Sequence, residues 1–366
     1  MLVGITYDLK ADYIAMGFSE EDAAEFDSPV TIQAIDDALC ALGFRTERVG
    51  ALPMLAGALL QGRRWDMVFN IAEGLNGFGR ESQVPALLDY YGIPYVFSDP
   101  MTLGVCLHKG VTKHVVRDKG VPTADFAVVE TAEDAAHVRL PFPLFVKPVA
   151  EGTGLGIGAA SKVRNHEELA AACARLIARH NQPVLVETYL PGRELTVGIT
   201  GTGKNARAVA ALEVVFAQTA ESQAYGYVNK QEFEDRMEYR LAHDAVGEHA
   251  CRVALEAWRA LGCRDGGRVD VRLDAQGVPN FIEVNPLAGL NPETSDLPIL
   301  CYKTGMTYRQ LIREIMDSAL ARNGIGHAMP ADPGPGSPLW PAENTPVSGA
   351  VCGTVHGAQA ATGIAG

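Results

Sequence analysis

The chain has 366 residues, 47% hydrophobic and 20% charged, a balance typical of globular proteins with two or three domains. Its 44 acidic residues outnumber its 31 basic ones, and the net charge of −13 argues against nucleic-acid or anionic-membrane binding. Seven cysteines without a C-x-x-C pair indicate reduced thiols instead of a zinc site or a disulfide framework. No apolar run has membrane-spanning length and the first residues lack a basic signal segment, so we expect a cytoplasmic protein.

The first unit, residues 1–102, alternates between strand and helix patterns. We expect strands at 2–6, 45–49, 65–70 and 93–97, and helices at 28–42 and 83–91. This order predicts a small parallel sheet with helices on both faces. Ligands bind such sheets at the carboxyl ends of the strands, which makes Tyr7 and the loop that contains Glu73 candidates for substrate binding.

Two further units and a tail are expected along the rest of the chain, over residues 103–189, 190–322 and 323–366. In the second unit, Lys147 interrupts an apolar strand, and a buried lysine needs a partner or an anionic ligand. Glycine at every second position of segment 152–158 lets backbone amides approach a phosphate closely. The tail is rich in glycine and proline, so we expect it to be disordered.

The third unit contains a predicted β-hairpin whose halves alternate apolar and polar residues around the turn-forming segment 274–277. Alternation puts Arg268 and Asp270 on one face, and Glu283 with Asn285 on one face of the partner strand. If the two faces coincide, their oxygen atoms suit Mg²⁺, which is held by one or two carboxylates and substrate phosphates. The alternative is a solvated, charged sheet face.

Motifs of other enzyme classes are incomplete or missing from the sequence. The G-x-x-x-x-G-K pattern at 198–204 has asparagine where Ser or Thr is needed and precedes a strand, so it predicts a hairpin turn. The sequence has neither an H-E-x-x-H pair nor a G-x-S-x-G elbow. Zinc-enzyme and serine-hydrolase functions are therefore disfavoured.

In order and rough spacing, the features of residues 65–322 resemble the ATP-grasp superfamily, and within it the D-alanine–D-alanine ligases. The supporting stretches are 92–95, 108–109, 112–113, 145–148, 184–187, 191–194, 267–270 and 283–286. The resemblance implies an α/β ATP-grasp fold with a small parallel N-terminal domain. It also implies a central lid domain and a C-terminal catalytic domain that enclose ATP between two sheets, and a homodimer.

The resemblance further implies roles for individual residues. Those implied to contact ATP are Lys109, Lys147, Thr153, Glu187, Leu190, Glu194 and Lys230, the last from a mobile loop. Those implied to bind two Mg²⁺ ions, or Mn²⁺ in their place, are Asp270, Glu283 and Asn285. Arg268 and the Gly289 amide would stabilise an oxyanion, with Lys230 at the γ-phosphate, and Thr294 or Ser295 would bind the second substrate's carboxylate.

The implied reaction transfers the γ-phosphate to a carboxylate, and an amine then attacks the acyl phosphate to form an amide. The family's glycine-serine-glutamate segment and histidine-glycine loop are absent here, and the chain has 4–8 and 70–74 in their place. A ligase for other amino acids in specialised metabolism therefore stays open beside D-alanine ligation. The second alternative is a nucleotide-binding module without catalysis, although the implied catalytic residues are intact.

Overall fold

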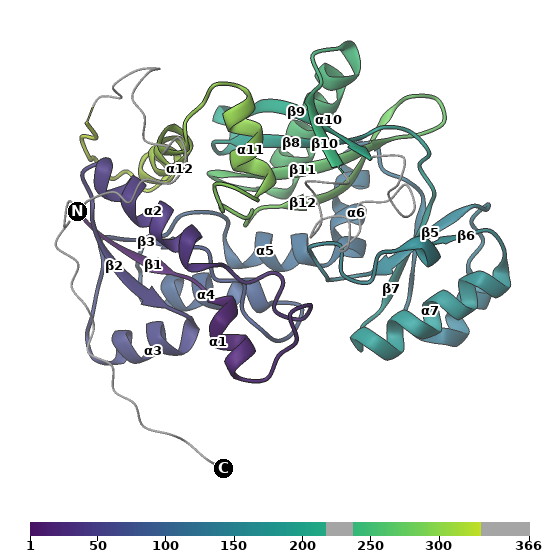
Figure 1. Ribbon diagram of the computed structural model, residues 1–366, viewed down its shortest axis with the longest axis horizontal. Coiled ribbons are helices and arrows are strands. Elements are labelled where there is room, and N and C mark those ends of the chain that lie inside the picture. Colours follow the sequence, from purple (N-terminus) through teal and green to yellow (C-terminus); the bar gives the residue numbers. More distant parts are fainter. Residues whose placement is uncertain (217–236, 331–366) are drawn as a thin grey trace.

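The computed structural model describes residues 1–216 and 237–330, and over these residues the strands form three sheets. The strands are β1 (Leu2–Thr6), β2 (Arg45–Gly50), β3 (Met67–Asn70), β4 (Phe126–Val129), β5 (Leu144–Pro148), β6 (Lys162–Val163), β7 (Val184–Thr188), β8 (Glu194–Thr200), β9 (Arg207–Phe216), β10 (Met237–Leu241), β11 (Gly266–Leu273) and β12 (Pro279–Asn285). The N-terminal sheet has the parallel order β2-β1-β3, the central sheet is β10-β9-β8-β11-β12, and the lid sheet is β4-β7-β5-β6 (Figure 1).

Ten α-helices lie within the described residues. They are α1 (Lys10–Ala15), α2 (Pro29–Ala41), α3 (Leu52–Leu60), α4 (Gln83–Tyr90), α5 (Pro100–Leu107), α6 (Lys109–Asp118), α7 (His166–His180), α10 (Ala245–Leu261), α11 (Asp296–Lys303) and α12 (Tyr308–Arg322). Short 3₁₀ turns occur at Arg80–Ser82, Ala132–His137, Ala159–Ser161 and Gly203–Asn205. No helix in the described ranges is long and apolar enough to cross a membrane.

The parallel N-terminal sheet forms as predicted, but the fourth strand expected at 93–97 does not. Tyr95 makes only an isolated bridge to Val68, and Phe97 turns away with a φ of 75°. The amide of Phe97 donates instead to Asp265 Oδ2 at 2.8 Å, in the third unit of the chain. Pro94 and Val96 still make backbone hydrogen bonds to Val68 of β3, and the pairing ends at Phe97, whose amide bonds to the other half of the molecule.

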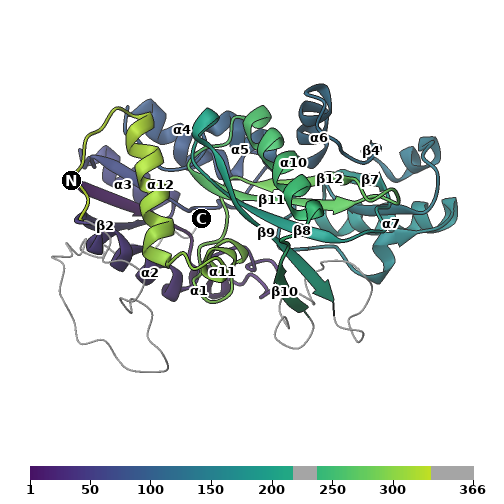
Figure 2. The same cartoon turned by 90° about the horizontal axis from the view of Figure 1, so that it is seen from above.

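The central sheet is covered by helices on both faces. Trp258 of α10 is fully buried against one face, together with Val197 and Val269. On the other face, the side chains of α11 pack so closely that a Cβ on Gly198 would lie 2.9 Å from Leu300. Figure 2 shows α12 between the central sheet and the N-terminal sheet, where it shares one core with α2. The lid sheet has its own core against α7.

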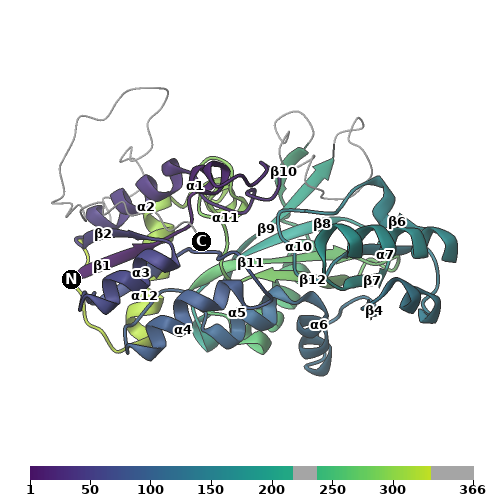
Figure 3. The ribbon, with the colours of Figure 1, turned by 90° about the horizontal axis from the view of Figure 1, so that it is seen from below.

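Helices α5 and α6 lie alongside β12 and α10, and α6 also contacts β4 of the lid sheet (Figure 3). The boundary expected at residue 102 therefore falls inside α5. At the other end, Ile325 and Met329 pack on the N-terminal core and His327 stacks on Phe44 with ring centroids 4.3 Å apart. The tail expected from residue 323 thus begins with packed residues, and 331–366 lie outside the described part of the chain.

Candidate active site

Two adjoining cavities lie at the centre of the molecule. The first lies between the lid sheet and the central sheet and is lined from β5, β7, β8, β11 and β12. The second has a volume of about 400 Å³ and extends from β12 toward the N-terminal sheet. Five residues line both cavities: Lys109, Glu151, Thr153, Arg268 and Glu283. A ligand in one cavity can therefore reach a ligand in the other.

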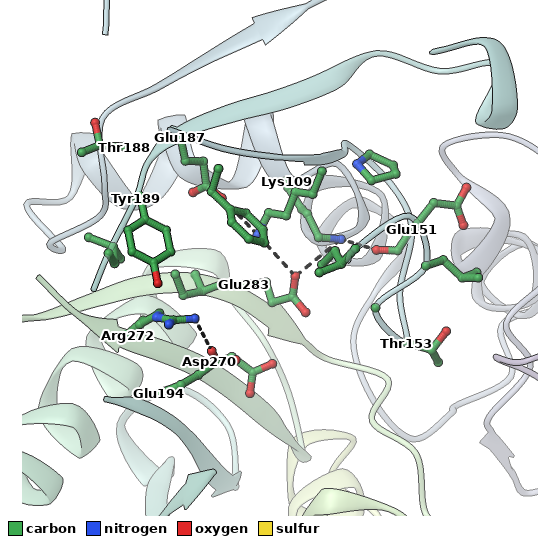
Figure 4. Close-up of a pocket in the computed structure, with 18 of the residues that line it drawn as sticks. Lys109, Glu151, Thr153, Glu187, Thr188, Tyr189, Glu194, Asp270, Arg272 and Glu283 are labelled. Carbon is green, nitrogen blue, oxygen red and sulfur yellow. Dashed lines mark hydrogen bonds and ion pairs between the residues drawn. The ribbon is translucent and has the colours of Figure 1, made fainter. Parts of the chain in front are cut away.

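The hairpin of β11 and β12 puts the predicted polar residues on one face. Asp270 lies directly opposite Glu283, and Arg268 lies opposite Asn285. The register shifts after Asp270 because β12 has one extra residue there, and on β11 the alternation continues to Arg272, which lines the same cavity. The predicted coincidence of the two faces is confirmed, and their oxygen atoms converge at the junction of the cavities (Figure 4).

Two lysines from different elements converge on Glu283. Lys147 comes from β5 of the lid, and Lys109 is the first residue of α6. Lys147 Nζ lies 3.8 Å from Glu283 Oε2. Lys109 Nζ lies 3.6 Å from the same oxygen (Figure 4). Both side chains are buried, as expected for Lys147 from its place in an apolar strand. Two buried cations therefore face the oxygen-rich hairpin across a short gap.

Glu187 at the end of β7 is buried between two lysines. Its carboxylate lies 3.1 Å from Lys147 Nζ and 2.5 Å from Lys113 Nζ. Burial alone would raise the pKa of Glu187, but Lys113 and Lys147 outweigh burial and the pKa lies below its usual value. The sequence pattern gave no role to Lys113, because its importance depends on this contact with a residue 74 positions away.

Asp270 is surrounded by charged groups. It contacts Arg268 at 2.6 Å and accepts a hydrogen bond from Thr196 at 2.8 Å. Arg268 also lies 3.2 Å from Asp296, the first residue of α11. Burial raises the pKa of Asp270, and Glu283 and Asp296 raise it further against the effect of Arg268. Negative charge is thus in excess at this corner.

The residues predicted to bind Mg²⁺ fit that ion. Asp270, Glu283 and Asn285 provide two carboxylates and one amide, with Asn285 Nδ2 3.5 Å from Asp270 Oδ2. The described residues contain no group of three His, Cys, Asp or Glu placed to hold a metal by themselves. Mg²⁺ commonly uses one or two carboxylates and completes its shell with water and substrate phosphates. The excess negative charge at Asp270 is what a bound cation would neutralise.

The residues predicted for adenine and ribose line the outer end of the first cavity. Leu190 is buried there, and Glu194 is paired with Arg272 at 2.7 Å. Arg272 and Lys162 both lie over the ring of Tyr189, and Lys162 Nζ is 3.7 Å from the ring centroid. A flat aromatic face with flanking cations suits a stacked base or a phosphate-bearing ligand.

The glycine segment forms a tight loop at the other end of this cavity. Thr153, with a φ of 49°, and Gly154, with a φ of 74°, occupy the left-handed region that favours glycine. The Thr153 hydroxyl is buried without a hydrogen-bond partner among the described residues. Such an orphaned group at a cavity wall marks a position where a ligand atom would be accommodated.

The loop also contacts the N-terminal unit, through two residues that had no predicted role. Glu25 Oε1 accepts a hydrogen bond from the Gly152 amide at 2.7 Å, and Arg80 donates to the Ala150 carbonyl at 3.0 Å. Glu25 and Arg80 are themselves paired at 2.8 Å. Only the folded chain brings these segments together, so no local sequence signal could have revealed the contact.

The residues predicted to bind the amino acids mostly line the second cavity. Gly289, Thr294, Ser295 and Glu73 are among its lining residues. Ser295 Oγ accepts from the Asn291 amide at 3.0 Å, and a Cβ on Gly289 would lie 2.7 Å from this oxygen. Tyr7 is placed elsewhere: it lines neither cavity, and its amide donates to the Gly50 carbonyl in the N-terminal sheet. Lys230 lies outside the described residues.

Tyr7 was expected at the site because it follows a strand of a parallel sheet. The cavity is reached instead by Glu73, Glu25 and Asp27. Glu25 and Asp27 belong to the connection between α1 and α2, which enters the space in front of the sheet. Chain order alone could not predict which of two neighbouring loops enters the cavity.

Comparisons with known proteins agree with this geometry. Residues 115–317 match a family model described as D-ala D-ala ligase C-terminus. The D-alanine–D-alanine ligase of Albidiferax ferrireducens is 35% identical over 248 residues, covering 66% of this chain and 69% of the relative. That of Bordetella avium is 33% identical over 247 residues, covering 66% and 75%. The uncharacterized protein y4sG of Sinorhizobium fredii is 32% identical over 267 residues, covering 71% and 77%.

Solved structures show the same fold at lower identity. A D-alanine–D-alanine ligase from Bacillus anthracis, complexed with ATP, superposes with a TM-score of 0.65 at 20% identity, covering 88% of this chain and 99% of that chain. The VanG D-Ala:D-Ser ligase from Enterococcus faecalis gives a TM-score of 0.66 at 19% identity, covering 87% and 99%. At these identities the likeness concerns the fold.

Proposed function

The chain belongs to the D-alanine–D-alanine ligase family of the ATP-grasp enzymes, and we propose that it is an ATP-dependent ligase that joins two amino acids. The observation that carries the proposal is the opposition of Asp270 and Glu283 on one sheet to Lys109 and Lys147 across the cavity. Oxygen ligands on one side and cations on the other are what a triphosphate with its metal requires.

In this proposal, ATP occupies the first cavity. Its phosphates lie at Lys109 and Lys147 beneath the loop that contains Thr153, and its adenine and ribose lie toward Leu190, Glu187 and Glu194. When ATP is bound, Lys147 and Lys109 contact phosphate oxygens, and their interaction with Glu283 becomes weaker. Mg²⁺ held by Asp270, Glu283 and Asn285 would neutralise charge on the transferring phosphoryl group.

Phosphoryl transfer to the first amino acid and formation of the amide take place in the second cavity. The carboxylate of the first amino acid accepts the γ-phosphate and becomes an acyl phosphate, which the amine of the second attacks. Arg268 and the Gly289 amide are proposed to stabilise the tetrahedral oxyanion, and Ser295 or Thr294 to bind the second carboxylate. The glycine loop would exclude water, which otherwise hydrolyses the acyl phosphate.

D-alanine is the amino acid in the names of the relatives, and it is the first substrate to test. Ligation of other amino acids remains the second candidate, because Glu73 and Glu25 also line the second cavity. A cytoplasmic location and a homodimer stay predictions from the sequence.

The test is ATP-dependent phosphate release with Mg²⁺ across a matrix of D- and L-amino acids, with product masses recorded. We expect release that depends on a specific pair and falls at least about 100-fold in Glu283→Ala, because the variant lacks one of the two carboxylates for the metal. An exposed control, Glu256→Gln on α10, should retain full activity. Binding of ATP without release for any pair would favour a non-catalytic module, and failure to bind ATP would refute the proposal.

A further inference from the structure

The wall of the second cavity that faces the N-terminal sheet is formed by carboxylates. We call Glu25, Asp27, Glu73 and Glu81 the acidic wall, since all four line this cavity. Arg80 adjoins them but does not line the cavity, because its guanidinium donates to Glu25 and to the Ala150 carbonyl. The acidic wall therefore presents four carboxyl groups to whatever occupies the space.

Two members of the acidic wall have no partner within the described ranges of the chain. Glu81 is only 9% exposed, yet its carboxylate makes neither a hydrogen bond nor an ion pair with the residues described. Glu73, which is partly exposed in the loop after β3, likewise makes neither a hydrogen bond nor an ion pair with the residues described. Lys10 also lines the cavity, but its Nζ lies 2.6 Å from Glu20. A buried, unpaired carboxylate is costly, and a ligand cation is the partner that this cavity can admit.

We propose that the acidic wall binds the charged side chain of a basic amino acid, so that one of the two joined substrates has a side-chain ammonium or guanidinium group. The inference rests on the proposed function and names its substrate class. The charges that line the cavity agree with it: Arg268 and Lys109 line it together with the acidic wall, so a substrate can pair its carboxylate with the cations and a side-chain cation with the acidic wall. A neutral amino acid has a single ammonium group, which leaves most of the acidic wall without a counter-charge.

The ionisation of the acidic wall supports the same occupant. Burial raises the pKa of Glu81 to about 7. Arg80 and Lys109 oppose this rise, and Glu25 adds to it. Burial also raises the pKa of Glu73, which faces Glu81, Glu25, Arg80 and Asp27. Burial also raises the pKa of Asp27 to about 7, against a hydrogen bond from Thr31. As pH rises from 6 to 8, Glu81 and Asp27 lose their protons, so a cation should bind better at the higher pH. The kcat/KM for a basic substrate should rise over this range more than that for a neutral one.

The experiment compares matched pairs of amino acids that differ in charge but little in shape. Lysine is paired with norleucine and arginine with citrulline, as both enantiomers, each offered with D-alanine, ATP and Mg²⁺. We expect the basic member to have about a tenfold or higher kcat/KM. Glu81→Gln and Glu73→Gln should bring the ratio toward one, and Glu256→Gln, exposed on α10, should leave it unchanged.

The outcomes separate this inference from the proposed function. Neutral members that equal the basic ones, with D-alanine pairs turning over, would overturn the basic substrate and leave the ligase intact. If no pair of amino acids gives phosphate release, the proposed ligase activity is refuted. Calorimetry with lysine and norleucine in the presence of ADP and Mg²⁺ then measures separately whether the acidic wall binds a basic side chain. Equal affinity for the two, or an equal lysine affinity in Glu81→Gln, would overturn the inference.

Discussion

Lys113 is fully buried and lies between a carboxylate and a backbone carbonyl. Its Nζ contacts Glu187 at 2.5 Å and donates to Thr123 Oγ1 at 2.6 Å, and the Thr123 hydroxyl donates to the Phe281 carbonyl at 2.9 Å. A side chain of α6 thereby joins the lid sheet to β12. Charged groups this deep are stable only as a paired set, so removing one partner should be costly.

We predict that Lys113→Met lowers the free energy of unfolding by about 3 kcal/mol, because Glu187 keeps its charge with one lysine fewer. Urea denaturation at pH 7 measures the loss. Lys119→Met, whose side chain is 59% exposed, should change stability by less than about 0.5 kcal/mol. Similar losses in both variants would contradict the assigned role of Lys113.

The same pair predicts a pH dependence. The pKa of Glu187 in the folded protein lies below 4.5, its ordinary value, which also applies to the unfolded chain. The stabilisation by the lysines is therefore complete above about pH 4.5 and is lost as pH falls through the folded pKa. The difference between wild type and Lys113→Met should narrow in acid and stay constant from pH 6 to 8.

At the scale of elements, Gly267 allows β11, β12 and α10 to pack closely. A Cβ at this position would lie 2.5 Å from the Asn285 carbonyl oxygen and 2.7 Å from the Trp258 ring. Neither the partner strand nor a fully buried indole can move away cheaply. The glycine thus fixes the distance between the buried core and the strand that contains Glu283 and Asn285.

We predict that Gly267→Ala destabilises the protein by about 1–3 kcal/mol, because the added methyl group overpacks the core. The same change at Gly57, inside α3 with open space around it, should stabilise by about 0.5–1 kcal/mol through helix propensity. Thermal unfolding of the two variants beside wild type gives both signs in one experiment. A neutral Gly267→Ala would show that the hairpin can separate from α10.

At the scale of the whole molecule, a few contacts connect segments far apart in the chain. Asp265 is fully buried and accepts hydrogen bonds from the Phe97 amide and from Arg322 at 2.8 and 2.7 Å. On the opposite side of the site, Glu25 connects the N-terminal unit to Gly152 of the glycine loop. These contacts fix the loop and the sheets around the space that ATP is proposed to occupy.

We predict that Glu25→Ala weakens ATP binding about tenfold, because the glycine loop loses a charge-assisted hydrogen bond. Calorimetry with ATP and Mg²⁺ in the absence of amino acids measures this effect apart from any role of the acidic wall. Glu21→Ala breaks a more exposed pair with Arg179 and should change the affinity less than twofold. Unchanged ATP affinity in Glu25→Ala would mean that the loop is positioned without this contact.

The sequence by itself determined the local elements and the chemistry of the hairpin. The bounds of β1 match the prediction, and the helix expected at 28–42 is α2, whose first turn is capped by Ser28. These features depend on hydrogen bonds between residues a few positions apart, which a sequence pattern contains. Alternation likewise placed Asp270 and Glu283 on one face, because strand periodicity is a local property.

Only the tertiary structure decided which distant groups meet. Lys113 beside Glu187, Asp296 beside Arg268 and Glu25 at Gly152 join segments that no periodicity relates. It also placed Tyr7 outside both cavities and reduced the strand expected at 93–97 to a single bridge at Tyr95. The physical reason is that burial and long-range hydrogen bonds depend on how whole elements pack, and a single side chain's position in the sequence does not contain that information.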